Sequence, residues 1–153
     1  MVGDSRDYRF PQSYRAAGGD QRLAPLGRRG RRIVVVDPRR TRSAVDADLH
    51  LAIEPGSDWA FLLGVLAVVF REGLENQSAV ASLPQDHIAR LRALVDLADM
   101  DGLSAHTGVP TPAVKEVARG YAKAEGAACI TMTGVSQNDT GTLGQWLSTV
   151  LDL

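Results

Sequence analysis

Two short apolar runs early in the chain predict neighbouring strands of a parallel sheet. Residues 33–36 form a continuous β-branched run between polar flanks, the pattern of a strand buried on both faces. In residues 49–53 apolar positions alternate with others, which predicts a second short extended segment. Pro38 ends the first run because it has no N–H to give to a ladder. The loop that follows lies at the carboxyl end of a strand, where open α/β sheets bind ligands.

Longer helical patterns follow these runs. Residues 58–70 are apolar throughout, which predicts a helix buried on most sides but too short to span a bilayer, since a span needs about twenty residues. A helix of this kind that packs on one face of a sheet would be partly uncovered on its other side. The apolar run therefore indicates that neighbouring structure is missing. The remaining helices are expected near residues 84–97, 103–109, 111–123 and 143–151, with Thr111 as the cap of the helix at 111–123.

A third β-type run, residues 128–131, predicts a further buried strand. We expect it to share one mainly parallel sheet with residues 33–36, with the helices at 58–70 and 111–123 packed on that sheet. The predicted fold class is therefore α/β, a Rossmann-like sheet flanked by helices. Residues 1–30 lack an apolar period and form a separate irregular, Arg-rich segment with one short helix near 21–29, which leaves 31–153 as the α/β domain.

Composition narrows the classes of function. A chain of 153 residues with 44% hydrophobic and 23% charged residues is typical of a globular domain. Residues 1–42 hold eleven Arg and four Asp, a net charge of +7 that leaves -8 for the rest. No stacking aromatics or DNA-binding motif accompany the arginines, so we expect no nucleic-acid partner. The single cysteine excludes an intramolecular disulfide and a four-thiolate cluster from this chain, and with no apolar leader it favours a cytoplasmic protein.

Candidate chemistry gathers in the loops after the two strands. Asp37, Arg39, Arg40 and Thr41 follow the first strand, and a Pro-Gly turn leads to Ser57 and Asp58 after the second. The two loops are about twenty residues apart, the spacing at which nucleotide-binding folds place a ribose-reading acid. Simpler roles remain open, because Asp58 could only cap a helix and the arginines could be solvated. The three histidines lack metal-ligand spacing, and no Gly-x-Gly-x-x-Gly or catalytic triad is present.

Several of these residues also carry a resemblance to a known family. Residues 35–41 (VVDPRRT), 47–48 (AD) and 54–58 (EPGSD) resemble the cofactor-binding stretch of molybdopterin oxidoreductases of the dimethyl-sulfoxide-reductase type, which include formate dehydrogenases and nitrate reductases. Residues 133–138 (TGVSQN) and 141–142 (GT) resemble that family's glycine-glutamine loop, in which histidine more usually follows the glutamine. Both matches occur in the family's order and at roughly its spacing, over about residues 30–153. The resemblance therefore identifies the chain as an internal fragment of such an enzyme.

The resemblance implies a cofactor, molybdenum bis(molybdopterin guanine dinucleotide), and residues that contact it. In the family, the acid matching Asp58 holds guanine, whose paired N1–H and NH2 donors suit the two oxygens of a carboxylate. Ser57 replaces the usual threonine and keeps the hydroxyl. The implied cofactor-binding residues are Asp37, Pro38, Arg39, Arg40, Thr41, Gly56, Ser57, Asp58, Thr133 and Gln137. A tight turn alone would also explain Gly134, which lies between the last two.

The expected function is to grip one guanosine arm of this cofactor as part of a molybdenum-dependent oxidoreductase. The implied partners are the cofactor and the remaining domains or subunits of the enzyme, and no membrane span is expected. An iron–sulfur cluster and the molybdenum ligand would belong to those remaining parts, so no residue of this chain is assigned to catalysis or to a metal. The alternative is a non-catalytic nucleotide-binding α/β module.

Overall fold

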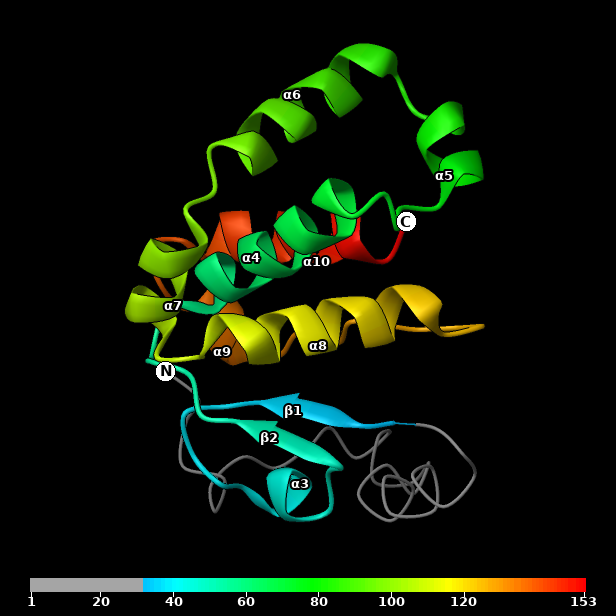
Figure 1. Cartoon of the computed structure of the whole chain (residues 1–153). Helices are drawn as coiled ribbons and strands as arrows, with labels where there is room; N and C mark the ends of the chain where they lie inside the picture. Colours follow the sequence, from blue (N-terminus) through cyan, green and yellow to red (C-terminus); the bar gives the residue numbers. More distant parts are fainter. Residues whose placement is uncertain (1–31) are drawn as a thin grey trace.

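The computed structural model describes residues 32–153, and the predicted N-terminal segment with its short helix lies outside this range. Two strands and eight helices follow one another in the described part of the chain (Figure 1). Their order and bounds are β1 (Val34–Val36), α3 (Arg42–Val45), β2 (Leu49–Leu51), α4 (Asp58–Arg71), α5 (Gln77–Ser82), α6 (Gln85–Asp96), α7 (Met100–Thr107), α8 (Thr111–Lys123), α9 (Thr133–Ser136) and α10 (Gly141–Leu151). The chain is thus α/β, with helices predominating.

The two predicted strands pair in parallel. Val34 lies opposite Leu49 and Val36 opposite Leu51, so the alternating segment does form a strand. The strand is one residue shorter than predicted, since Ile33 lies just before it and its amide donates to the Asp48 carboxylate at 2.7 Å. It is also half-buried rather than buried on both faces. Two strands do not establish the Rossmann-like sheet.

The third predicted strand is wrong. Residues 127–132 run extended between α8 and α9, but they form no ladder with β1 or β2, and Ile130 is 81% exposed. A β-branched run becomes a strand only when another strand supplies its hydrogen bonds, and the described part of the chain provides none at this position.

Helix α4 is the centre of the molecule. Residues 60–69 are all buried. One side, with Phe61 and Val65, packs with Leu51 and Val114 from β2 and α8. The other side, with Leu66, packs with residues of α6 and α10. Figure 1 shows α8 between α4 and the sheet, with α6 above. The expectation that this helix lacks cover is therefore wrong, because four helices, α6, α7, α8 and α10, surround it.

Local signals set the ends of the helices around α4. Gly108 ends α7 with φ of 72°, a left-handed conformation that favours glycine. Thr111 begins α8 but does not cap it, because its hydroxyl donates to the Met100 carbonyl at 3.3 Å. Asn76 and Asp99 provide the side-chain caps of α5 and α7. The short helices α3, α5 and α9 were not predicted.

An arginine joins two of the long helices. The Arg71 guanidinium, at the end of α4, donates to the carbonyls of Val95 at 2.9 Å and Ala98 at 2.7 Å, at the end of α6. The Val95 carbonyl also accepts the Ala98 amide at 3.1 Å, so the arginine adds charged hydrogen bonds at the carboxyl end of a helix, where the helix dipole favours a cation. Within residues 32–153, no helix is long and apolar enough to cross a membrane.

Candidate functional site

The first predicted loop is held by its own side chains. Asp37 is 9% exposed, and its carboxylate accepts the Arg39 amide at 2.8 Å across Pro38. Thr41 is the N-cap of α3, where its hydroxyl accepts the Ala44 amide at 3.4 Å. Arg39 and Arg40 are exposed at the tip. The loop therefore presents guanidinium groups on a backbone that Asp37 and Thr41 fix.

The second loop is a tight turn into α4. The Ser57 amide donates to the Glu54 carbonyl at 3.2 Å, and Gly56 has φ of 82°, which together with Pro55 matches a type II turn. Ser57 is 1% exposed and its hydroxyl donates to the same carbonyl at 2.7 Å, so it stabilises the turn instead of capping α4. Asp58 is half-buried in the first turn of α4, where the helix dipole favours a negative charge.

The third predicted segment is built around a residue that the sequence did not single out for this role. Asn138 accepts the Thr140 amide at 2.9 Å and the Thr140 hydroxyl at 2.7 Å, and it donates to the Val135 carbonyl at 3.2 Å. This Asn side chain closes the loop between α9 and α10 as an Asx turn does. Thr133 begins α9, Gln137 follows its end, and both are exposed.

The structure brings the first two loops to the ends of two paired strands. Asp37 follows β1 directly, its amide donates to the Leu51 carbonyl of β2 at 3.1 Å, and the chain reaches Asp58 a few residues later. The third segment packs on α10. In Figure 1 the carboxyl ends of β1 and β2, the start of α4 and helix α9 all lie toward the left of the view. A single crevice that includes Asp37, Asp58 and Gln137 stays a prediction.

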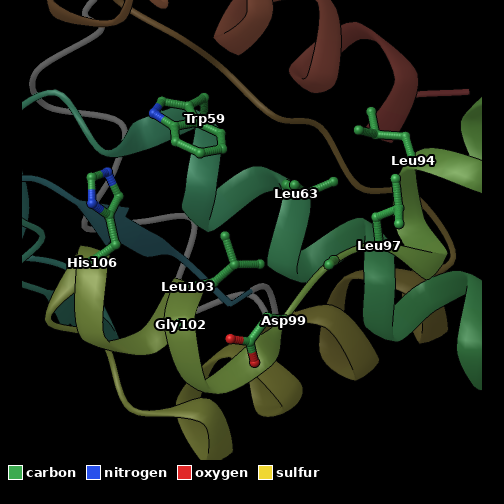
Figure 2. Close-up of a pocket in the computed structure, with 9 residues that line it drawn as sticks. Trp59, Leu63, Leu94, Leu97, Asp99, Gly102, Leu103 and His106 are labelled. Carbon is green, nitrogen blue, oxygen red and sulfur yellow. The ribbon is translucent and has the colours of Figure 1, made fainter.

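A cavity of about 410 Å³ lies beside the start of α4 (Figure 2). It is mainly apolar, and its lining includes Trp59, Leu63, Leu103 and His106 from α4 and α7. The Trp59 and His106 rings are 5.6 Å apart between centroids and tilted by 51°. Sequence reasoning missed this cavity, although the position of Trp59 directly after Asp58 was a signal that an aromatic group borders the predicted site.

Two ionisable groups with raised pKa values, Tyr121 and Cys129, lie away from these loops, near the end of α10. The Tyr121 hydroxyl and the Cys129 amide both donate to the Asp152 carboxylate, the second at 2.7 Å. Burial, and then the bond to Asp152, raises the pKa of the Tyr121 phenol well above its usual range. Burial, and then the Asp152 charge, raises the pKa of the Cys129 thiol to about 11. Cys129 is therefore a protonated packing residue near neutral pH. Residues 32–153 contain no cluster of metal-ligating side chains.

Comparisons with known proteins agree with the motifs in the loops. No protein-family model matches the chain. Formate dehydrogenase H of Escherichia coli (strain K12) is 34% identical over 72% of this chain and 15% of its own length. Nitrate reductase of Klebsiella oxytoca is 30% identical over 92% of this chain and 15% of its own length. The assimilatory nitrate reductase catalytic subunit of Bacillus subtilis (strain 168) is 29% identical over 74% of this chain.

The fold also has a counterpart among solved structures. Acetylene hydratase from Pelobacter acetylenicus matches with a TM-score of 0.76 at 24% identity, over 81% of this chain and 17% of that chain. This chain thus spans about 15% of the length of the first two relatives named above. The motifs, the relatives and the shared fold agree, and the chain belongs to the molybdopterin oxidoreductase family, of the formate dehydrogenase and nitrate reductase type.

Proposed function

We propose that this chain holds the guanosine arm of a bis(molybdopterin guanine dinucleotide) cofactor as part of a molybdenum-dependent oxidoreductase. The observation that carries the proposal is the placement of Asp58. Asp58 is half-buried at the start of α4, the most buried helix, and a hydrogen-bonded turn with Gly56 leads the chain into it. A carboxylate held in this way can accept two parallel hydrogen bonds from guanine without reordering the backbone.

The neighbouring residues fit the rest of a nucleotide. Arg39 and Arg40 place two guanidinium groups on the loop after β1, and guanidinium suits phosphate oxygens. Asp37, Thr41 and Ser57 hold the two loops in position through one side-chain oxygen each, and they border the same proposed site. Thr133 and Gln137 would contact the cofactor from the α9 side. When bound, the molybdenum centre would supply the electron transfer, while the residues of this chain bind and orient the guanosine arm.

Guanine discrimination by Asp58 tests this function. The tryptophans of the described residues are Trp59, beside Asp58, and Trp146 on α10, so Trp146→Phe leaves a fluorescence reporter next to the proposed site. In that background, GDP, IDP and ADP are titrated into the full chain. We expect weak binding that favours GDP over ADP, with IDP between them because it lacks the exocyclic amine. Asp58→Asn should lower the affinity for GDP by about 10–100-fold, the equivalent of losing charge-assisted hydrogen bonds.

Asp101→Asn is the matched control. Asp101 lies in the first turn of α7 as Asp58 lies in the first turn of α4, so both substitutions remove a similar favourable interaction with a helix dipole. The control should lose the same small amount of stability and leave the preference for GDP unchanged. Equal affinity for GDP and ADP, or an Asp58→Asn variant that still discriminates, contradicts the guanosine site.

A further inference from the structure

One extended segment is apolar on the side that faces solvent. In residues 127–132, Cys129 packs against the core cluster around α4 and α10, and the Thr131 hydroxyl donates to Gln145 of α10 at 2.9 Å. The residues between and after them point the other way, since Ile130 is 81% exposed and Met132 is 42% exposed. The side chains therefore alternate as in a strand, with one side on α10 and the other uncovered.

The outward side is unlike that of an ordinary surface strand. A strand with one face in water usually places polar side chains on that face, whereas Ile130 and Met132 are apolar. The backbone is also unpaired, because no hydrogen bond joins residues 127–131 to another strand within the described range, and the Cys129 amide is satisfied only by the Asp152 carboxylate. An extended segment whose backbone groups are unpaired and whose outward side chains are apolar is a template for strand addition.

We propose that residues 127–132 are the docking edge for a β-strand from the rest of a molybdopterin oxidoreductase. The proposal rests on the proposed function. The relatives that share these motifs are much longer, and this chain accounts for about 15% of them. The added strand would pair with the main chain of residues 128–132 and bring apolar side chains over Ile130 and Met132. Helix α10, which carries Gln145, also exposes Trp146 at 46% and would extend the covered area.

Other exposed apolar residues do not make such an edge. Leu97 is 83% exposed but follows the end of helix α6, where its backbone amide donates to the Ala93 carbonyl. Val45, 60% exposed, ends α3 and its amide donates to the Thr41 carbonyl. Single exposed side chains of this kind are normal on protein surfaces. Leu97 therefore serves as a control of equal exposure for Ile130.

Co-expression tests the proposed edge. The full chain is produced together with E. coli formate dehydrogenase H from which the matched 110 residues have been deleted. We expect a complex in which the amides of Ala128, Ile130 and Met132 exchange with deuterium at least 100-fold more slowly than in the isolated chain. Ile130→Lys should weaken the complex at least tenfold, whereas Leu97→Lys should not. Both variants should melt like the unmodified isolated chain, because both side chains are already in water.

Each other outcome overturns the docking edge. These outcomes are the absence of a complex, a complex that Ile130→Lys leaves intact, and amides that stay unprotected within it. If these amides are protected from exchange in the isolated chain and the protection rises with protein concentration, the occupant is a second copy of the chain. If the protection is lost when residues 1–31 are deleted, the occupant is that segment. The GDP titration needs no partner. A failed complex with intact guanine discrimination removes only the edge, and an intact complex without discrimination removes only the guanosine site.

Discussion

Three polar side chains of the strand-end loops form hydrogen bonds with the backbone of their own loop, through one oxygen each of Asp37, Thr41 and Ser57. Short polar side chains often bond to nearby backbone in this way wherever the chain turns, so a polar residue in a loop motif can have a structural role as well as a ligand contact. Asp58 differs from these residues, because no side-chain hydrogen bond caps α4 and the acid is half-buried in its first turn. The motif predicted which residues gather at the strand ends, but the hydrogen bonds that hold each loop depend on turn geometry that only the structure shows.

Gly141 is a residue at which a single methyl group should be costly. An added Cβ would lie 2.6 Å from the Ser136 carbonyl oxygen, and backbone at that distance cannot move aside easily. We expect Gly141→Ala to lower the free energy of unfolding by about 1–3 kcal/mol, measured by urea denaturation. Gly120→Ala is the control. It lies in α8 with only the flexible end of Arg32 nearby at 3.6 Å, so it should raise stability by about 0.5–1 kcal/mol. Equal effects of the two changes would contradict this packing.

Alkaline pH should weaken the fold through Tyr121 and Cys129. Both groups have folded-state pKa values above their unfolded values, which means that the native state holds these protons more tightly. Their contribution to stability is complete below about pH 9 and is lost as the pH rises through the folded pKa values. Tyr121→Phe and Cys129→Ala should each show a shallower fall in stability between pH 9 and 11 than the unmodified chain, measured by urea denaturation. Parallel curves for all three proteins would refute the assignment.

At the scale of elements, long periodic segments were predictable and short ones were not. The helices at 58–70 and 111–123 match α4 and α8 within one residue, because each carries three or more turns of consistent pattern. Helices α3, α5 and α9 have four to six residues, too few for a period, and depend on caps and tertiary contacts. The run at 128–131 has the composition of a strand, but strand formation is non-local, and composition alone does not supply a partner.

Arg71 should hold the end of α6 on α4. Replacing it with methionine keeps the apolar stem and removes the hydrogen bonds to the Val95 and Ala98 carbonyls. We expect Arg71→Met to lower the free energy of unfolding by about 1–2 kcal/mol. This loss is smaller than that for a fully buried charged hydrogen bond, because the Arg71 side chain is partly in water. Hydrogen exchange should become faster in α6 and remain unchanged in α8. Arg90→Met, which removes only an exposed pair with Asp86 at 3.8 Å, should leave both unchanged.

At the scale of the whole molecule, the uncovered apolar surface is not where the sequence pattern suggested. The most apolar stretch, residues 60–69, is fully buried by the chain's own helices. Exposed apolar groups lie instead on residues 127–132 and on α10, and singly at Val45, Leu97 and Leu153. Hydropathy ranks segments by composition, whereas exposure depends on which elements pack around them. The family motifs placed the candidate residues at the strand ends, but they could not show how the helices close over α4.

The isolated chain is expected to bind the molybdenum cofactor weakly and not to turn over substrate. One edge of a sheet supplies few hydrogen bonds, each worth roughly 1.5–3 kcal/mol when charged, against several kcal/mol of lost translational and rotational freedom. The measurement reconstitutes the full chain with molybdenum cofactor and assays a viologen dye with formate, nitrate and sulfoxide. Stoichiometric molybdenum retained through gel filtration, together with turnover, would contradict this expectation.

Because α4 belongs to both core clusters, the two sides of the molecule should unfold together. Opening α4 would expose to solvent both Phe61, which packs on the sheet side, and Leu66, which packs on the α6 side. The amides of α4 should therefore exchange only through global unfolding. Asp58 sits in the first turn of this helix. A nucleotide bound there would therefore stabilise the whole fold rather than one loop, by about 2.7 kcal/mol at a hundred times its Kd. Cofactor occupancy and cellular lifetime of the protein would then rise and fall together.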